Sequence, residues 1–477
     1  MQRVWYRHDQ EVVVAALRRR EPIDMVTTMN SGPLDGLVAL HEELGILTAL
    51  GEVRSTRRRR GIEDELLLRT AAVLPFLPQP GLTGAAAQLF GEPAILLRLG
   101  WSPLQICMGD NERHRHCEER RQASLPCDPE TLRDALGRVT EECWCKVQRA
   151  GVQALFERRL VRGGTYAVDG TGLGPGLRLV CLVCVSSERP VIVAWRVLSG
   201  DASEKGKEAA VTRSLIEQLV ELGGPECIGL LLADALYADG PLLAWCKFVQ
   251  NIDVLVPLPS DREIHQDLDR MVREGLIPLR RHSYVRRIQG HKQRRTVELG
   301  VAREMTCWDS FLEAARRYGA AQPQLWACLI RPMDATDPED RPWTLASTRD
   351  WASGQEAYQT FRSRWHIEND GYRELKEGWG LEAERWGRKL AVQRGRITLT
   401  CLAFNTAQVY LTRLGQRAAE RGIRRLRQRY RRELGTSPAV VYIGSGFAVL
   451  SIEKLVAILG APARRSLLPV TAAARPP

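Results

Sequence analysis

The chain has 477 residues, which is too long for one ordinary domain and long enough for two or three. Hydrophobic residues make up 44% and charged residues 26%, an ordinary globular composition, and no apolar run approaches the roughly 18 residues of a membrane helix. The formal net charge of +11 is compatible with a polyanionic partner. A basic run alone is equally well explained as a face of the protein exposed to solvent. The first residues lack the pattern of a secretion signal, so we expect a cytoplasmic protein with no membrane partner.

Residues 1–160 are predicted to form a mainly helical N-terminal domain. The segment LTGAAAQLFGEPAILLRLGWSPLQI places small and apolar residues at helical spacing, so either a helix-turn-helix that binds a DNA end or a plain helical bundle fits it. A run of arginines precedes the candidate amphipathic helix IEDELLLRTAAVLPFL, where it either contacts phosphates or forms a solvated loop. These arginines are Arg57, Arg58, Arg59 and Arg60.

The twelve cysteines fall at irregular spacing, and without a secretion signal we expect reduced thiols rather than a disulfide framework. Cys181 and Cys184 lie inside an apolar run and are predicted to be core residues. One set of Cys and His residues is crowded but lacks a paired C-x-x-C arrangement, so a structural zinc site there stays an open alternative. The set consists of Cys107, His114, His116, Cys117 and Cys127.

From Gly163 onward, short apolar runs bounded by turn residues predict three consecutive strands, TYAVDGTG, GLRLVCLVCVSS and RPVIVAWRVLS. The segment KEAAVTRSLIEQLVELGG then has helical spacing and a glycine stop signal. A strand, CIGLLLADA, a helix, GPLLAWCKFVQN, and a strand, IDVLVPLP, follow. The order β, β, β, α, β, α, β is the ribonuclease H-like one, and it predicts an α/β fold with right-handed crossovers between parallel strands.

The pattern breaks between residues 260 and 351, where arginine-rich, strand-like pieces such as SYVRRI, RTVELGVA, LWACLIRP and PWTLAS predict a β-rich insertion. The core is therefore predicted to comprise 161–259 and 352–405. A basic, helical C-terminal region, 406–465, and a disordered tail, 466–477, complete the expected organisation.

Two aspartates end nearly all-apolar predicted strands: Asp169 follows TYAV, and Asp234 follows IGLLLA. A carboxylate in that position is costly to bury unless it is paired, hydrogen-bonded or bound to a cation, so two of them in one sheet favour a shared site. Divalent metal is the obvious counter-charge. The alternative is that each aspartate caps the turn or helix that follows it.

A later segment of helical composition supplies further charged residues on one broad face, because four-residue steps drift only about 40° around a helix. These residues are Arg364, Glu368, Tyr372 and Lys376. On periodicity alone, such an alternating stripe is also typical of a solvated, salt-bridged surface. Glu374 is a substitute for Glu368 if the helix register differs.

The blocks AVDGTGL, LLADALYADG and FRSRWHIENDGYRELKEGWGLE resemble the three active-site blocks of the DDE transposases of bacterial insertion sequences. The branch concerned has a β-rich insertion before the last block and a Tyr, Arg, Glu, Lys signature in that block. Arg364 and Glu368 keep the signature's three-residue gap. Phe361 stands at the Tyr position, and Lys376 comes one residue late.

The resemblance implies a ribonuclease H-like core in which Asp169, Asp234 and Glu368 are the catalytic and metal-binding residues, with Mg²⁺ as the cofactor and Mn²⁺ as a substitute. It implies metal-dependent cleavage of double-stranded DNA at transposon ends, followed by transfer of the freed 3′-hydroxyl into target DNA. The expected assembly is a homodimer on paired ends, associated with the nucleoid when acting. Expected DNA contacts are Arg364, Lys376, Tyr372, Trp343 and Arg57 to Arg60.

Trp343 and the arginine-rich stretch 280–295 belong to the insertion, which in the resembled family lies close to the DNA end; a core tryptophan and a solvated hairpin are the alternatives. Two other functions stay open. The first is a transposase-derived DNA-binding protein without catalysis, which the departures at Phe361 and Lys376 favour. The second is a ribonuclease H-like metal nuclease without strand transfer.

Overall fold

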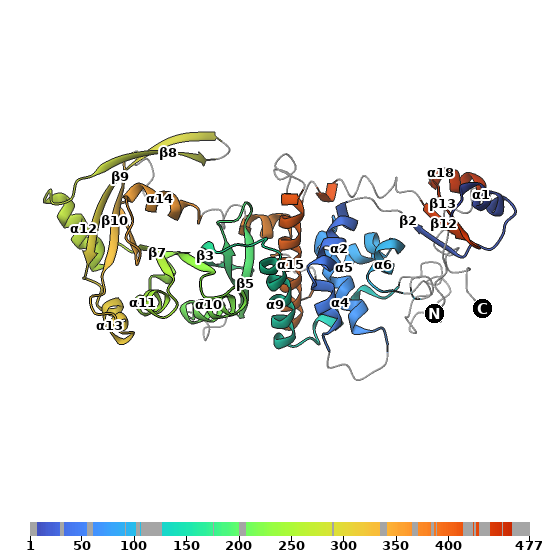
Figure 1. The fold of residues 1–477 in the computed structure, drawn as a ribbon, viewed down its shortest axis with the longest axis horizontal. Helices are drawn as coiled ribbons and strands as arrows, with labels where there is room; N and C mark the ends of the chain where they lie inside the picture. Colours follow the sequence, from blue (N-terminus) through green and yellow to red (C-terminus); the bar gives the residue numbers. More distant parts are fainter. Residues whose placement is uncertain are drawn as a thin grey trace. The chain divides into compact units, whose positions relative to one another are not determined.

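The structure is a computed structural model, and it describes residues 7–28, 33–54, 61–90, 92–101, 105, 126–174, 176–199, 207–288, 291–333, 341–364, 371–382, 386–387, 389–413, 423, 426–428, 439–450 and 452–459. The chain divides into two compact units, one of residues 1–154 with 375–477 and one of residues 155–374 (Figure 1). Some of the predictions fall outside the described residues. They concern Arg57, Arg58, Arg59, Arg60, Cys107, His114, His116, Cys117, Glu368 and the tail 466–477.

The first unit contains a group of helices around α15 (Leu390–Arg413), which packs against α2, α4 and α8. Most residues of α15 are buried, which explains why the helix shows no one-sided apolar stripe. Residues 1–160 are helical over most of their described part. The helices there are α1 (Gln10–Arg18), α2 (Pro33–Glu43), α3 (Ile46–Gly51), α4 (Asp64–Val73), η1 (Leu74–Phe76), α5 (Leu82–Gly84), η2 (Ala85–Leu89), α6 (Pro93–Arg98), α8 (Pro129–Leu136) and α9 (Glu141–Glu157).

The C-terminal region is not only helical, which differs from the expectation. Strands β12 (Ala439–Ile443) and β13 (Gly446–Leu450) form an antiparallel hairpin, followed by α18 (Ile452–Leu459). The hairpin pairs with β1 (Arg7–His8) and β2 (Met25–Thr28) in a four-stranded sheet of order β1-β13-β12-β2. Its inward residues pack with α1 and α18 in one apolar core. Apolar residues in AVVYI and GFAVL, joined by a turn with Gly444 at φ 59°, favour this hairpin.

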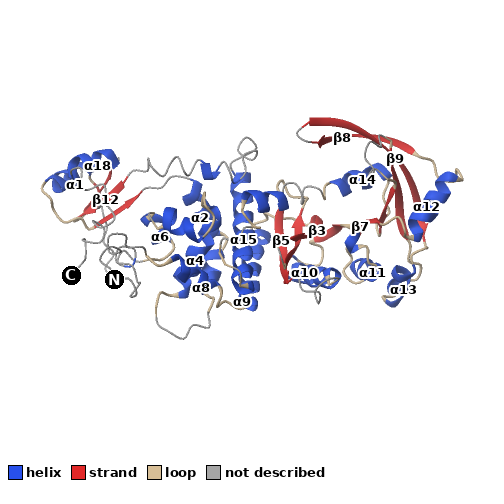
Figure 2. Cartoon of the chain, turned by 180° about the vertical axis from the view of Figure 1, so that it is seen from behind, coloured by secondary structure: helices blue, strands red, loops and turns tan. Residues whose placement is uncertain are grey.

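The second unit is built on a nine-stranded sheet of order β5-β4-β3-β6-β7-β11-β10-β9-β8 (Figure 2). Its first five strands form the predicted core, with β3, β6 and β7 parallel and β4 and β5 antiparallel. The predicted order of strands and helices is confirmed, and the arrangement is compatible with a ribonuclease H-like domain. The elements are β3 (Gly164–Gly172), β4 (Leu177–Cys184), β5 (Val191–Ser199), α10 (Glu208–Gly223), β6 (Ile228–Ala233), η6 (Ala235–Tyr237), α11 (Gly240–Phe248) and β7 (Asp253–Leu258).

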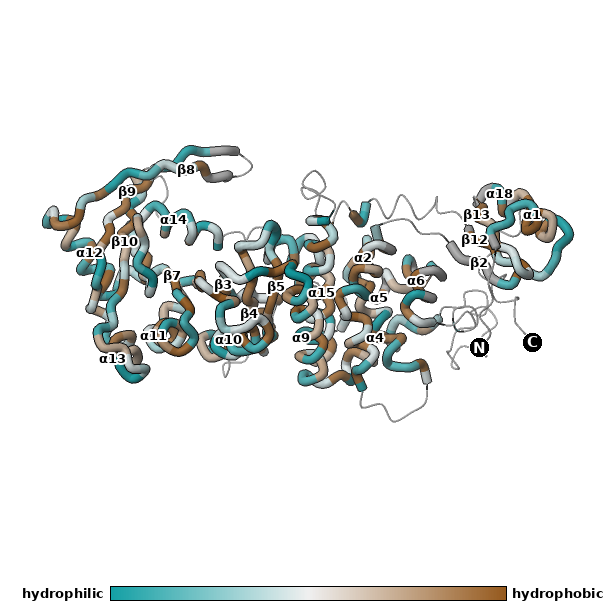
Figure 3. The backbone as a smooth tube through the Cα atoms, viewed as in Figure 1, coloured by the Kyte–Doolittle hydropathy of each residue, from teal (hydrophilic) through white to brown (hydrophobic). Residues whose placement is uncertain are grey.

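The region predicted as a β-rich insertion continues the same sheet. Its strands are β8 (Arg280–Ile288), β9 (His291–Met305), β10 (Leu325–Pro332) and β11 (Trp343–Ser347), and β11 pairs directly with β7. Helices α12 (Glu263–Arg273) and α13 (Asp309–Arg317) accompany them. Much of β8 is hydrophilic, whereas β10 is largely hydrophobic (Figure 3). The hydrophilic strand lies at the edge of the sheet, where Arg280, Arg281 and Ser283 are exposed, whereas His282 is buried.

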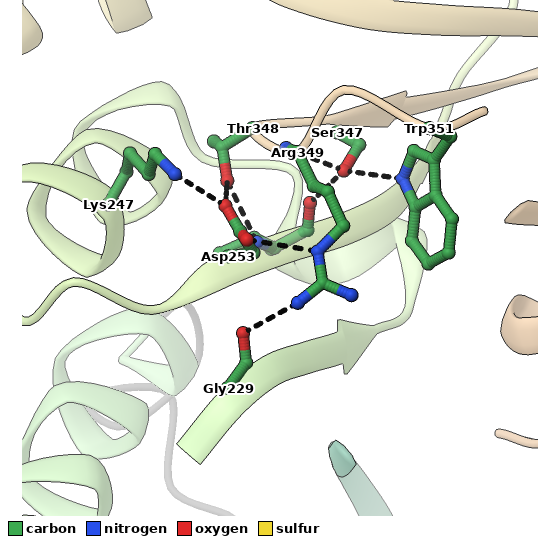
Figure 4. Close-up of polar contacts among 8 residues, drawn as sticks. Gly229, Lys247, Asp253, Ser347, Thr348, Arg349 and Trp351 are labelled. Carbon is green, nitrogen blue, oxygen red and sulfur yellow. Dashed lines mark hydrogen bonds and ion pairs between the residues drawn. The ribbon is translucent and has the colours of Figure 1, made fainter. Parts of the chain in front are cut away.

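A polar cluster ties β7 to β11 at the amino end of β7 (Figure 4). The Asp253 carboxylate accepts hydrogen bonds from Lys247 Nζ at 2.7 Å and Arg349 Nε at 3.0 Å. Arg349 also donates to the carbonyl of Gly229 on β6, at 3.2 Å. Trp351 Nε1 donates to Ser347 Oγ at 3.0 Å. The cluster thus anchors the chain just before α14 (Gly354–Arg362), which leads into the predicted active-site segment.

Candidate active site

Asp169 and Asp234 lie side by side at the carboxyl edge of two adjacent parallel strands. The last paired residues of β3 and β6 are Val168 and Ala233; Asp169 is the next residue of β3, and Asp234 is the residue that follows β6. Adjacent strands lie about 4.8 Å apart, so this register brings the two aspartates together. Asp169 is 8% exposed, and the side chain of Asp234 is 37% exposed. One carboxylate is therefore buried and the other is open to solvent.

The guanidinium of Arg364 contacts both carboxylates. Its Nη1 donates to Asp169 Oδ2 at 3.1 Å, and its Nη2 lies 4.0 Å from Asp234 Oδ1. Arg364 is only 5% exposed, and a charge so deeply buried is costly unless it is paired. Arg364 and the two aspartates therefore form one ionic group.

Helix α14 delivers Arg364 to this group. The helix begins after Ser353, whose hydroxyl accepts the backbone N–H of Glu356 at 3.2 Å, and it buries Ala357 and Phe361. Arg364 follows its last residue by two positions, so the capped start and the apolar face determine where the guanidinium lies.

Tyr372 also reaches Asp169, but through the backbone. Its hydroxyl donates to the carbonyl oxygen of Asp169 at 2.5 Å, and the residue is 5% exposed. Burial raises the pKa of Tyr372 well above its usual value, so the hydroxyl remains a donor at any physiological pH. Lys376, the next member of the predicted stripe, forms an ion pair with Glu382 at 2.7 Å.

The alternative that each aspartate caps the turn or helix that follows it does not account for Asp234. Asp234 precedes the short turn η6 but makes no side-chain capping hydrogen bond to it. Asp239 performs that role for α11 by accepting the Leu242 N–H at 2.7 Å. Asp169 accepts the N–H of the adjacent Gly170 at 2.7 Å, which leaves its other oxygen to Arg364. The Asp234 carboxylate is thus not committed to the fold of the turn that follows it.

The donor chemistry of the site fits a hard divalent cation. Asp169 and Asp234 offer carboxylate oxygens from two adjacent strands, and Mg²⁺ binds one or a few carboxylates while it keeps several waters. Within the described ranges, no group of three Asp, Glu, His or Cys side chains is placed to hold a metal ion. The third predicted carboxylate, Glu368, lies outside those ranges.

Trp343 is part of an aromatic cluster beside α14. Its ring centroid lies 5.7 Å from that of Phe361 and 6.2 Å from that of Tyr358, and the residue is half-buried. The guanidinium of Arg362 stacks on Tyr284 of β8, 3.8 Å from the ring centroid. No local sequence pattern indicates the pairing of Arg362 with Tyr284, because the two residues come from elements far apart in the chain.

Seven of the ten described cysteines are buried, and Cys143, Cys145 and Cys307 are half-buried. Cys181 and Cys184 are buried, as predicted, and none of the described cysteines forms a disulfide. Burial, with Asp128 nearby, raises the pKa of Cys127 to about 12, so the thiol of this member of the crowded Cys and His set is protonated at neutral pH.

Residues 175–406 match the family model described as a transposase DDE domain. The matched range contains Asp234, Arg364 and Lys376 and begins six residues after Asp169. This part of the chain is thus similar to DDE transposases. No curated protein matches the chain. Among the described residues, no helix is long and apolar enough to cross a membrane.

Proposed function

We propose that the protein is a DNA transposase that cleaves the ends of its element and transfers them into target DNA with Mg²⁺ or Mn²⁺. The observation that carries this proposal is the pairing of Asp169 with Asp234 at the edge of two parallel strands, with Arg364 contacting both. The match of residues 175–406 to a transposase DDE domain supports the same function.

Glu368 is the proposed third carboxylate. Arg364 stands four positions before it and Tyr372 four positions after it, and both contact Asp169. These two contacts bring the chain on either side of Glu368 to the same aspartate. The short span between them supports a place for Glu368 beside the aspartate pair.

A divalent ion bound by these carboxylates would supply Lewis-acid stabilisation of the phosphate oxygens during in-line phosphoryl transfer. Asp169, held by Arg364 and by the Gly170 N–H, would provide a fixed oxygen ligand. Asp234, whose side chain is more exposed, is proposed as the ligand nearer to the DNA. Water is the first nucleophile and a DNA 3′-hydroxyl the second, so the reaction needs no covalent bond between DNA and protein.

DNA is the proposed partner, at transposon ends and at the target. Arg364 and Lys376 are proposed to contact phosphates next to the scissile one, which would fix position rather than read sequence. The helical region 1–160 with Arg57 to Arg60, and Trp343 of the segment 260–351, are proposed as further contacts. A homodimer holding two ends is the proposed assembly.

The proposal is tested by cleavage of DNA that carries the element's ends, with Mg²⁺ and with EDTA. Asp169→Ala, Asp234→Ala and Glu368→Ala should each abolish cleavage while DNA binding persists. The matched control is Asp261→Ala, because Asp261 is an exposed acid of the same unit. Cleavage by all three variants at the wild-type rate would reject the proposed site.

A DNA-binding protein without catalysis is the second candidate. Phe361, which stands at the signature's Tyr position, is buried against Trp343, and Lys376 is paired with Glu382. Phe361 therefore offers no polar group to DNA, and Glu382 competes with a phosphate for the Lys376 ammonium. End-specific binding with no Mg²⁺-dependent cleavage by the wild type would favour this candidate. Cleavage without joining of pre-cut ends to target DNA would instead favour a nuclease.

A further inference from the structure

The contact between Tyr372 and Asp169 differs in kind from the contact between Arg364 and Asp169. Arg364 binds the carboxylate, whereas the Tyr372 hydroxyl donates to the main-chain carbonyl of the same residue at 2.5 Å. The parallel pairing of β3 with β6 ends at Val168, so Asp169 is the first residue of β3 beyond that ladder. Tyr372 therefore hydrogen-bonds β3 at the first residue that β6 no longer pairs with.

Cys181 lies beside this contact on the neighbouring strand. It lies directly opposite Asp169 in the pairing of β3 with β4, and side chains of opposite residues share one face of the sheet. The Cys181 thiol contributes, after burial, to the raised pKa of Tyr372, so the two side chains lie close together. The Tyr372 hydroxyl is thus buried next to Cys181, with the Asp169 carbonyl as its acceptor.

We infer that Tyr372 is a positioning residue: by fixing the backbone of β3 at Asp169, it sets where the Asp169 carboxylate meets a divalent ion. This inference rests on the proposed function. It also gives Tyr372 a role other than the expected DNA contact, since a buried hydroxyl that donates its proton to a main-chain carbonyl is not available to a phosphate. Small displacements of a ligand group are costly in catalysis, so the hydrogen bond from Tyr372 should affect how strongly Asp169 binds the divalent ion.

The test compares two tyrosine variants of the full-length protein. Tyr372→Phe removes only the hydroxyl. Tyr166→Phe is the matched control, because Tyr166 is a fully buried tyrosine of β3 whose hydroxyl donates to the Arg162 carbonyl at 3.4 Å, away from Asp169. The measurements are the Mg²⁺ concentration for half-maximal DNA cleavage, DNA affinity in EDTA, and hydrogen–deuterium exchange of the β3 amides.

For Tyr372→Phe we expect the half-saturating Mg²⁺ concentration to rise about fivefold, which is the typical effect of removing one hydrogen bond. The β3 amides near Asp169 should exchange faster, and DNA affinity should not change. Tyr166→Phe should alter none of these. Should Tyr372→Phe not fold, Cys181→Ala, which removes the buried side chain opposite Asp169 and close to Tyr372, is expected to raise the half-saturating Mg²⁺ concentration as well.

Two results would overturn the inference: wild-type Mg²⁺ dependence and β3 exchange in Tyr372→Phe, or equal changes in Tyr166→Phe. A loss of DNA affinity in Tyr372→Phe with unchanged exchange would assign the residue to DNA binding instead. If the wild type cleaves no DNA at any Mg²⁺ concentration, the proposed function fails. The exchange of β3 then still decides whether Tyr372 anchors the strand.

Discussion

The guanidinium of Arg364 and the carboxylate of Asp169 form a 3.1 Å ion pair in which both side chains are almost fully buried. Removing one partner of such a pair leaves an uncompensated charge in the interior, which costs about 3 to 5 kcal/mol. The pair therefore contributes to the fold of this unit as well as to its site.

We predict that Arg364→Ala lowers the free energy of unfolding by about 3 kcal/mol, measured by urea denaturation. Arg364→Lys should recover only part of this stability, because an ammonium cannot reach both aspartates as the planar guanidinium does. The control is Arg317→Ala. Arg317 forms an exposed ion pair with Glu313 at 3.6 Å, and its loss should lower the free energy of unfolding by less than about 0.5 kcal/mol. Equal stability of Arg364→Ala and wild type would contradict the geometry of this pair.

The edge hairpin of β8 and β9 is predicted to bind DNA phosphates. Arg280, Arg281 and Arg294 are exposed on it. Replacing Arg280 and Arg294 together by alanine should weaken binding to the same extent for all DNA sequences. It should also reduce the salt dependence of the affinity by nearly 1 for each phosphate that the protein no longer neutralises. Fluorescence anisotropy at several salt concentrations measures this slope. An unchanged slope, the same as that of Arg317→Ala on α13, would exclude the hairpin from the DNA interface.

The Asp253 cluster should stabilise the sheet without affecting chemistry. Asp253→Asn removes the charge that Lys247 and Arg349 share, and we predict a decrease of about 1 to 2 kcal/mol in unfolding free energy, because both cations are partly exposed. The cluster lies at the amino ends of β6 and β7, whereas Asp169 and Asp234 lie at the carboxyl edge. The folded variant should therefore cleave DNA at the wild-type rate. A lower rate at full folding would show that the cluster positions Arg364.

His41 is predicted to make stability depend on pH. Burial lowers the pKa of His41 to about 3, while its Nδ1 lies 2.8 Å from Thr406 Oγ1. In the unfolded chain the pKa is about 6.5, so below that pH the unfolded state binds a proton that the folded state does not. The stabilisation is present above pH 6.5 and is lost as the pH falls toward 3.

His41→Gln should remove this component. Between about pH 6 and 5, the unfolding free energy of the wild type should fall by about 1 kcal/mol per pH unit more than that of the variant. Urea denaturation at a series of pH values provides the comparison. Parallel pH profiles for the two proteins would mean that His41 is accessible to protons in the folded state.

The order of core elements could be predicted from the sequence, because apolar runs bounded by Gly, Pro or charged turns mark the strands from Thr165 to Leu258. The placement of Asp169 and Asp234 at strand ends followed from the same pattern. What periodicity could not indicate was the register of β3 against β6, which alone makes the two aspartates neighbours.

Long-range contacts could not be predicted in the same way. Tyr372 was assigned to a charged face, but a helical face does not reveal which atom of β3 it meets. Asp253 and Arg349 are separated by nearly a hundred residues, and nothing local marks them as partners. The pairing of residues 25–28 with the C-terminal hairpin was missed for the same reason, because a four-residue strand carries too little alternation to indicate its partner.

The most direct test of the central claim is localised cleavage of the protein chain by hydroxyl radicals generated at Fe²⁺ bound in place of Mg²⁺. We predict cuts near residues 169 and 234 and between Arg364 and Tyr372, which excess Mg²⁺ suppresses and which Asp169→Asn and Asp234→Asn abolish. Cuts at other positions, or cuts that persist in both variants, would contradict a metal site on this aspartate pair.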